Sequence, residues 1–460
     1  MPGLVPGIHV FAFYLIEDVD GRDKPAMTAA PAWRNIVLGA GRIAMIDRRT
    51  FTTLFAGALA SPNTAWGQTM PHKAVFYASV GPALMLYHLD VDKAALARQS
   101  TVQLPANVQY AWPHPSAHFL YVASSSGGPG SRGVQGTEHY LTALRVDPAT
   151  GALQAHGPSA ALPSRPIHMS LDRTGAYALT AYNNPSGVTV HRINADGTVG
   201  EEVKQTAALD GGIYGHQVRA TPANNAVILV TRGNAAAAGK PEDPGALKVY
   251  AFKDGQLTNR ASIAPNGGYG FGPRHLDFHP SLRLAYLSLE TQNKLHVYRL
   301  KDDRFEPDAI FKQETLAEPG NIRGRQAAST MHVHPNGRFV YVGNRASDTV
   351  EFEGKKVFPG GENSVAVYAI DQTTGEPTLI QNADVHGIHP RTFSLDPSGR
   401  MMVCAHILPM LVREGAGVKS VPANLTTFRV GDDGKLTFAN AYEVDTGAAM
   451  QFWSGMVALG

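Results

Sequence analysis

The sequence predicts an all-β fold, a seven-bladed β-propeller closed by pairing of its N- and C-terminal strands within one blade. Short apolar segments alternate with turn residues, and no convincing helix of ten or more residues interrupts them. A strand–turn–strand motif recurs along the chain, and seven units of about 56 residues would account for residues 68–460. Four strands per unit, repeated around a ring, hide most strand edges.

The repeated motif is a short strand, a turn, a second strand rich in Tyr, Val and Leu, a loop and a third strand. The clearest copies begin RHLDFHPSLRLAYLSLE, MHVHPNGRFVYVGNR and PRTFSLDPSGRMMVCAHI. The turn positions lie 49 to 62 residues apart and are Pro115, Arg173, Pro222, Pro280, Pro335 and Pro397. A seventh copy, starting KAVFYASV, lacks its first strand, which the C-terminal QFWSGMVAL is able to supply. Three histidines precede turn prolines, so we expect His114, His279 and His334 to hydrogen-bond the turns.

Composition excludes several classes of protein. The chain has 460 residues, 43% of them hydrophobic, and a net charge of +2, which gives no electrostatic signal for nucleic acid or a membrane surface. The single cysteine, Cys404, rules out an internal disulfide framework, and its apolar surroundings indicate a small core residue.

Residues 45–68 have the character of an export signal. Arg48 and Arg49 precede a short apolar stretch, LFAGALA, and a small-x-small site at Ala65-Trp66-Gly67. This pattern is typical of a twin-arginine signal peptide. We therefore expect residues 1–67 to be an upstream segment plus signal, with translation starting at Met45, and residues 68–460 to be the propeller. The twin-arginine export machinery would then be a partner, and the mature protein periplasmic or secreted.

Polar residues recur where the first strand of each unit begins and the second ends. Because these strands are antiparallel, both positions meet at one mouth of the channel. Arg274, His275 and Glu290 occupy them in one unit, and we expect them to meet there rather than be buried in the sheet. The other pairings are His168 with Tyr182 and Asn183, His216 with Arg232, His332 with Asn344 and Arg345, and Arg391 with His406. Long loops at residues 124–138, 233–245 and 346–362 emerge on the same face.

These residue types suit an anionic ligand and proton transfer. Guanidinium groups bind carboxylate or phosphate bidentately, and histidines exchange protons near neutral pH. Glu290 could orient an imidazole or activate water. The absence of a GxSxG motif disfavours a serine hydrolase. No local ligand spacing supports a metal site, so we expect neither metal nor cofactor, although histidines from different blades could converge.

The stretches GPRHLDFHPSLRLAYLSLE, MHVHPNGRFVYVGNR and HPRTFSLDPSGRMMV resemble the seven-bladed lactonase family over roughly residues 72–460. That family includes 6-phosphogluconolactonases and carboxy-cis,cis-muconate lactonizing enzymes. The resemblance implies lactone chemistry without a required metal, with His168, His216, Arg274 and Glu290 as the catalytic set. It implies that His275, His332, Arg345 and Arg391 support substrate binding.

Three departures from the family pattern surround the expected pocket: LTAYNN in the third blade, Thr231-Arg232-Gly233 in the fourth, and His406 in the seventh. The substrate is therefore expected to be a small anionic lactone, a sugar lactone or a carboxylate-bearing one. Export favours a non-phosphorylated lactone, because 6-phosphogluconolactone is made in the cytoplasm. Two alternatives stay open: cyclisation of carboxymuconate, and a non-catalytic periplasmic binding propeller.

Overall fold

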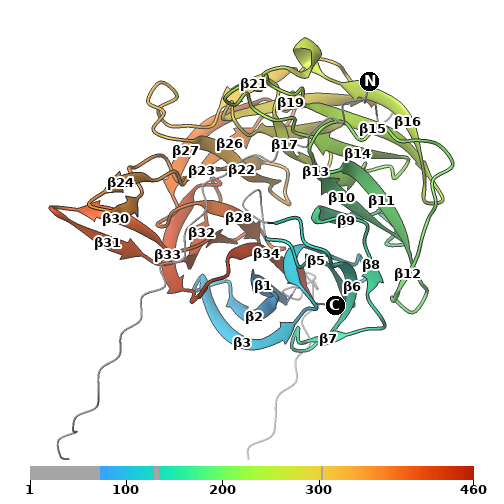
Figure 1. Cartoon of the computed structure of the whole chain (residues 1–460), viewed down its shortest axis with the longest axis horizontal. Coiled ribbons are helices and arrows are strands. Elements are labelled where there is room, and N and C mark those ends of the chain that lie inside the picture. The colour runs from blue at the N-terminus through green and yellow to red at the C-terminus, as the bar shows by residue number, and fades with distance from the viewer. Residues whose placement is uncertain (1–72, 129–133, 302–303, 460) are drawn as a thin grey trace, which may run out of the picture. The chain divides into compact units, whose positions relative to one another are not determined.

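The computed structural model describes residues 73–128, 134–301 and 304–459. It is built almost entirely of β-strands, which form seven blades around a ring, five with four strands and two with five (Figure 1). We name each blade by its innermost strand. The predicted division at residue 67 and the predicted export signal at residues 45–68 lie outside the described residues.

The first four blades, written from the innermost strand outwards, have the following strands. The β34 blade has β34 (Gln451–Ala458), β1 (Ala74–Val80), β2 (Ala83–Asp90) and β3 (Ala95–Gln103). The β4 blade has β4 (Asn107–Pro113), β5 (Phe119–Ser125), β6 (His139–Val146) and β7 (Leu153–Ala155), with β8 (Ala160–Ala161) also on β6. The β9 blade has β9 (Pro166–Leu171), β10 (Tyr177–Asn183), β11 (Ser186–Ile193) and β12 (Val199–Glu202). The β13 blade has β13 (Gly215–Ala220), β14 (Ala226–Thr231), β15 (Ala246–Lys253) and β16 (Gln256–Ile263).

Three further blades complete the ring. The β17 blade follows a short 3-10 turn (Pro265–Gly268) and has β17 (Pro273–Phe278), β18 (Leu284–Leu289), β19 (Lys294–Lys301) and β20 (Arg304–Phe305), with β21 (Phe311–Glu314) also on β19. The β22 blade has β22 (Gln326–Val333), β23 (Phe339–Ala346), β26 (Ser364–Ile370) and β27 (Pro377–Asp384). The β28 blade has β28 (Pro390–Leu395), β29 (Met401–His406), β32 (Asn424–Val430) and β33 (Leu436–Glu443). Two hairpins lie outside the blades: β24 (Val350–Phe352) with β25 (Lys355–Val357), and β30 (Met410–Glu414) with β31 (Gly417–Val421).

The ring is closed by the two ends of the described chain. β34 pairs antiparallel with β1, with Ala74 opposite Ala458 and Ala78 opposite Ser454. Neighbouring innermost strands contact one another around the whole ring, in the order β4, β9, β13, β17, β22, β28 and β34. The predicted seven-bladed propeller, including closure by the C-terminal strand, is therefore confirmed.

The hydrophobic core is divided among the gaps between neighbouring blades. One buried cluster joins the β13 and β17 blades through Ile228 and Leu287, and another joins the β17 and β22 blades through Tyr286 and Val342. Cys404 is likewise buried, between the β22 and β28 blades. Each blade is therefore apolar on both faces, and the sequence reads as strands rich in Val, Leu and Tyr.

The turn histidines hydrogen-bond their own turns, as predicted, and two of them also link one blade to the next. His334 Nδ1 accepts a hydrogen bond from the Asn336 backbone at 3.1 Å, so Nε2 carries the proton and donates to the Gly399 carbonyl at 2.9 Å. His279 makes the same contact with the carbonyl of Gly337 at 2.8 Å. Gly399 has a φ of +76°, and a Cβ there would lie 2.2 Å from the His334 ring, so this turn requires glycine.

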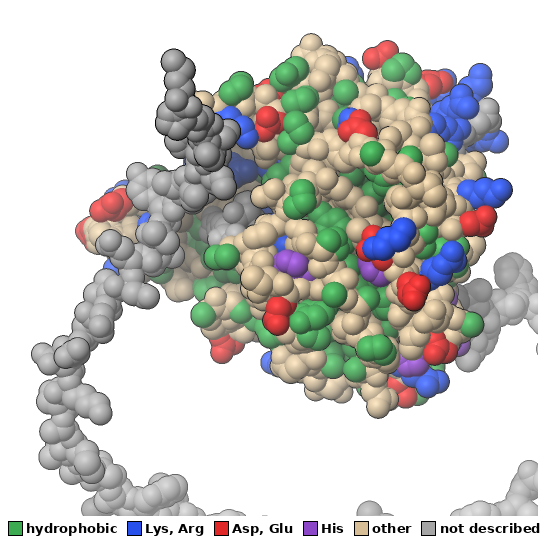
Figure 2. All heavy atoms as spheres, turned by 45° about the vertical axis from the view of Figure 1, so that its right-hand side comes forward, with side chains coloured by type: hydrophobic (Ala, Val, Ile, Leu, Met, Phe, Trp, Pro, Cys, Tyr) green, Lys and Arg blue, Asp and Glu red, His purple; other side chains and the backbone are tan. Residues whose placement is uncertain are grey.

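Acidic and basic side chains are interspersed on the face drawn in Figure 2, without separation into patches of one sign. This distribution agrees with the net charge of +2. Within the described ranges, no helix is long and apolar enough to cross a membrane.

Candidate active site

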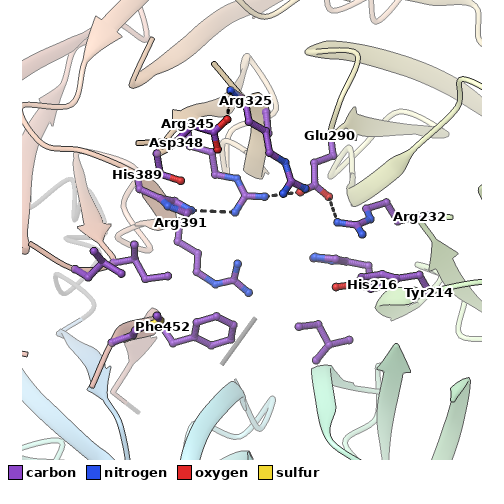
Figure 3. A pocket seen from close by; sticks show the side chains of 16 residues that line it. Tyr214, His216, Arg232, Glu290, Arg325, Arg345, Asp348, His389, Arg391 and Phe452 are labelled. Carbon is purple, nitrogen blue, oxygen red and sulfur yellow. Dashed lines mark hydrogen bonds and ion pairs between the residues drawn. The ribbon is translucent and has the colours of Figure 1, made fainter. Parts of the chain in front are cut away.

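A pocket of about 120 Å³ lies at the mouth where the innermost strands begin (Figure 3). Several of its lining residues share one position, the second residue of an innermost strand. They are Ile167, His216, Ala327, Arg391 and Phe452. Five blades therefore aim a side chain at the same small volume.

β-Bulges set the direction of these side chains. In the β13 blade the register shifts between Gly215 and Gln217, so His216 has no opposite residue on β14. The same shift occurs at Arg274 in the β17 blade and at Arg391 in the β28 blade. A bulge bends its strand and re-aims the extra residue, which is why bulges are frequent beside active sites.

Glu290, directly after β18, is enclosed by guanidinium groups. Its Oε1 accepts a hydrogen bond from Arg345 Nη2 at 2.5 Å, and its Oε2 accepts one from Arg232 Nη1 at 3.1 Å. Arg274 Nε lies 4.0 Å from the same Oε2. Burial raises the pKa of Glu290, but the three arginines outweigh it and hold the pKa well below 4.5. Glu290 is therefore ionised and a weak base.

Arg274 stands at the same strand-start position as His216 and Arg391, but it is buried and does not line the pocket. Its side chain is 1% exposed, and Nε and Nη1 find no hydrogen-bond partner in the described part of the chain. Burial and repulsion by Arg345 lower the pKa of Arg274 to about 9, so the group stays charged at neutral pH. His275 and Glu290 are also buried, at 4% and 2% exposure. Arg274 and Glu290 do meet, as expected, but all three groups are enclosed and not open to the channel mouth.

Arg391 projects into the pocket, and its guanidinium has no carboxylate partner among the described residues (Figure 3). It stacks on the Phe452 ring, with 3.6 Å between the guanidinium carbon and the ring centroid. Burial, together with repulsion by Arg274 and Arg345, lowers the pKa of Arg391 well below its usual value. An anion bound beside Arg391 would relieve this unfavourable charge.

His216 is the imidazole that lines the pocket. Burial and the positive charge of Arg274 hold the pKa of His216 well below 6.5, so its ring is neutral at physiological pH. Its Nδ1 is buried and has no hydrogen-bond partner among the described residues. A neutral imidazole in this setting can accept a proton.

His275 and His168 lie deeper in the channel and do not line the pocket. The His275 ring centroid is 5.1 Å from that of His216 and 5.9 Å from that of His168. His168 in turn stacks on Tyr110 at 3.9 Å. The structure thus brings the predicted histidines of three blades into one buried column but exposes only His216 to the pocket.

His332 belongs to the opposite end of the channel. It lines a separate cavity of about 300 Å³ with Trp112 and Trp453, and its Nδ1 lies 3.9 Å from Asp277 Oδ2. β22 contributes Ala327 to the active-site pocket and His332, five residues later, to this cavity. The predicted convergence of His332 with the other groups is therefore not what the structure shows.

Sequence reasoning missed Tyr214 and His389, which stand two residues before the bulged His216 and Arg391. Both residues line the pocket and have positive φ, +59° and +61°. The Arg232 guanidinium carbon lies over the Tyr214 ring, 3.9 Å from its centroid. His389 Nε2 accepts a hydrogen bond from Arg345 Nη1 at 3.2 Å. The available signal was their constant spacing from a strand-start His or Arg.

A metal site finds no support in the part of the chain that the structure describes. No group of three or more His, Cys, Asp or Glu side chains there is arranged to hold an ion. Only His216 of the three channel histidines reaches the pocket.

Comparison with known proteins assigns the chain that carries this site to a family. The model of the seven-bladed β-propeller lactonases matches residues 76–407. The chain belongs to the seven-bladed β-propeller lactonase family. The match covers β17, β18 and β23, the strands that carry the Glu290 cluster.

Relatives within the lactonase family include two bacterial 6-phosphogluconolactonases. The Bacillus subtilis protein is 27% identical over 335 residues, which cover 70% of this chain and 83% of the relative. The Pectobacterium carotovorum protein is 29% identical over 307 residues, 66% of this chain and 79% of the relative.

Solved structures share the fold. The periplasmic gluconolactonase of Pseudomonas aeruginosa superposes with a TM-score of 0.61 at 21% identity, covering 84% of this chain and 99% of that one. A Bacteroides fragilis protein described as a putative 6-phosphogluconolactonase gives a TM-score of 0.58 at 19% identity, covering 86% and 100%. At such identities the likeness concerns the fold.

Proposed function

We propose that this lactonase-family protein hydrolyses a lactone in the pocket at the mouth where the innermost strands begin. The observation that carries the proposal is the pairing of a neutral imidazole, His216, with an uncompensated guanidinium, Arg391, in one pocket. The first provides a base, and the second provides a site for negative charge. The names of the relatives, all of them lactonases, support the same chemistry.

The reaction uses water and no cofactor. His216 removes a proton from a water molecule as the water oxygen bonds to the lactone carbonyl carbon. The carbonyl oxygen gains negative charge, which Arg391 stabilises. The bond between the acyl carbon and the ring oxygen then breaks, and the ring oxygen takes the proton from the imidazolium. The product is a hydroxy acid whose carboxyl group loses its remaining proton to solvent, which leaves a carboxylate beside Arg391.

Glu290 has a positioning role in this mechanism, acting on the arginines, whereas the sequence suggested that it orients an imidazole or activates water. A carboxylate enclosed by Arg232, Arg345 and Arg274 binds a proton poorly. It instead neutralises part of the cluster and fixes the two guanidiniums that line the pocket. Arg274 and His275 act on His216 without touching the substrate. The charge of Arg274 lowers the pKa of His216, and the His275 ring lies 5.1 Å from the His216 ring.

The pocket fits an anionic lactone or a neutral one that becomes anionic on opening. Arg232 and Arg345 are paired with Glu290. Arg325 also lines the pocket, but it is exposed to solvent, and it is its backbone N–H that bonds Asp348. Arg391 is therefore the more enclosed guanidinium available for a substrate carboxylate, a phosphate or the oxyanion, and the exposed Arg325 offers a second at the rim. No feature of this pocket favours cyclisation of a muconate or ligand binding without turnover.

We also propose export, with residues 1–67 removed or omitted and residues 68–460 forming the mature protein. The paired arginines at 48 and 49 and the small-x-small site at 65–67 support it. Cell fractionation of the full-length protein and of an Arg48→Lys, Arg49→Lys variant tests this. Retention of the variant in the cytoplasm is expected, and equal export of both would refute the twin-arginine route.

The hydrolytic function is tested by pH-stat turnover on a panel of lactones that includes glucono-1,5-lactone and 6-phosphogluconolactone, each against its spontaneous hydrolysis. Acceleration of at least one lactone is expected. Loss of the ultraviolet absorbance of a carboxymuconate diene, with no lactone hydrolysed, would assign the pocket to cyclisation instead.

A further inference from the structure

A second hollow, which we call the outer groove, lies beside the active-site pocket between the β22 and β28 blades. It measures about 690 Å³, within the range of about 300–1,000 Å³ that is usual for small-molecule sites. It opens on the same mouth of the ring, because its lining includes Gln326, the first residue of β22, and Ile388, two residues before β28.

The pocket and the outer groove share a wall at the start of β22. Gln326 faces the groove, whereas Arg325 and Ala327 on either side of it line the pocket. Asn363 also faces the groove, and its Oδ1 accepts a hydrogen bond at 2.9 Å from the backbone of His389, which lines the pocket. A ligand that fills the pocket is thus within reach of the groove.

The wall is held rigidly from the groove side. Gln326 Nε2 donates to the carbonyl of Glu362 at 2.7 Å, and Gln326 Oε1 accepts from the backbone N–H of Glu362 at 2.9 Å. The Glu362 carboxylate accepts hydrogen bonds from Asn382 Nδ2 at 3.0 Å and from the Ala317 backbone at 2.9 Å. Such a network presents its polar groups to a ligand in fixed positions.

The groove has a different charge from the pocket. It is lined by the carboxylates of Glu318, Glu362 and Asp384, against one guanidinium, Arg323. An anionic group is therefore disfavoured there, whereas the pocket disfavours a cationic one. Carboxylates and amides are the groups that hydrogen-bond the adjacent hydroxyls of a neutral sugar.

The two hairpins form the outer side of the groove. They project from the ring beside the β22 and β28 blades (Figure 1). Phe358, just after β25, donates its backbone N–H to the Leu411 carbonyl of β30 at 2.8 Å, so the hairpins are joined. Phe358 and Val412 of β30 line the groove. Residues at both hairpins thus form part of the lining of this hollow.

We propose that the outer groove is a subsite for a neutral glycosyl group, so that the substrate is the lactone of an aldonic acid carrying a further sugar residue. This inference rests on the proposed hydrolysis in the pocket. The lactone ring occupies the pocket beside His216 and Arg391, and the glycosyl group extends over the solvent side of the wall formed by Gln326 and Asn363 into the outer groove. A reaction that oxidises the reducing end of an oligosaccharide to a lactone would supply such a substrate.

The first test compares kcat/KM of the whole protein for three lactones: glucono-1,5-lactone and its derivatives with glucose at O4 (cellobionolactone) and at O6 (gentiobionolactone). At least one glycosylated lactone is expected to exceed gluconolactone by tenfold or more. Equal values for all three would overturn the subsite while leaving lactone hydrolysis in place.

Two exposed groove residues provide variants that should fold. Asp384→Ala and Glu318→Ala are each expected to reduce the preference for the glycosylated lactone at least fivefold and to leave gluconolactone turnover unchanged. Asp432→Ala, at an exposed aspartate in the turn between β32 and β33, is the matched control. A preference that survives both groove variants would contradict the assignment.

Product binding separates failure of the subsite from failure of hydrolysis. Titration calorimetry with cellobionate, gentiobionate and gluconate needs no turnover. Tighter binding of a glycosylated acid, lost in Asp384→Ala, supports the groove even if no lactone is hydrolysed. Binding of all three acids with the same affinity overturns it.

Discussion

Replacement of Glu290 by glutamine tests how the arginine cluster is held. The substitution keeps the shape of the side chain and removes its charge, so three buried guanidiniums lose their shared anion. The Glu290 side chain is 3% exposed and that of Arg274 is 1%, so water cannot screen the repulsion that remains. Breaking a buried ion pair by removal of one partner costs about 3–5 kcal/mol.

This loss can be converted into a melting temperature. At about 2.1 cal/mol/K per residue, the propeller, which spans residues 73–459, has an unfolding entropy of about 0.8 kcal/mol/K. Glu290→Gln is therefore expected to lower Tm by about 4–6 °C. Glu314→Gln is the matched control, because Glu314 forms an exposed ion pair with Lys294 that contributes about 0–1 kcal/mol.

The stability difference depends on pH with a definite sign. The pKa of Glu290 in the folded protein lies well below its usual 4.5. Its contribution is therefore complete above about pH 4.5 and is lost as the pH falls through the lower, folded value. Calorimetry at neutral and acidic pH checks both statements. If Glu290→Gln had the same Tm as Glu314→Gln at neutral pH, the stability of the arginine cluster would not depend on the Glu290 carboxylate.

Three further variants address the site. Arg391→Ala should lower kcat/KM for the best lactone about 10- to 100-fold, because it removes a charged hydrogen-bond donor, and steady-state kinetics would show whether the loss falls on kcat or KM. His216→Ala should lower kcat by about 10²- to 10⁴-fold. Because the pKa of His216 is depressed, wild-type kcat/KM should stay level from pH 8 to about 6.5 and fall only below that; a fall centred above pH 7 would assign the base elsewhere. His332→Ala should keep activity within about twofold, since His332 lies at the opposite end of the channel, and a loss like that of Arg391→Ala would place it back in the site.

The fold could be predicted because its determinants are local and repeated. The Pro/Asp/Gly turns, the apolar strands and the unit length are properties of short segments, and the C-terminal strand was the missing part of an otherwise complete series. The contacts of His279 and His334 were predictable for the same reason, since each histidine bonds the turn that it precedes.

The site was harder to predict because bulges and depth in the channel leave no local pattern. Strand alternation alone does not show that His216 and Arg391 are the extra residues of a bulge, aimed differently from their neighbours. Arg274 has the same bulge but is covered by Glu290 and its arginines. His332 stands seven residues into β22, far enough along the strand to reach the other end.

The most direct test of the proposed chemistry is a pH-stat assay at pH 7. It measures turnover of glucono-1,5-lactone and its glycosylated or phosphorylated derivatives by the wild-type protein, Arg391→Ala and His216→Ala. The pocket geometry predicts acceleration of at least one lactone by the wild-type protein and its loss in both variants, with each variant folded as judged by its Tm. Hydrolysis at the wild-type rate in both variants would contradict it.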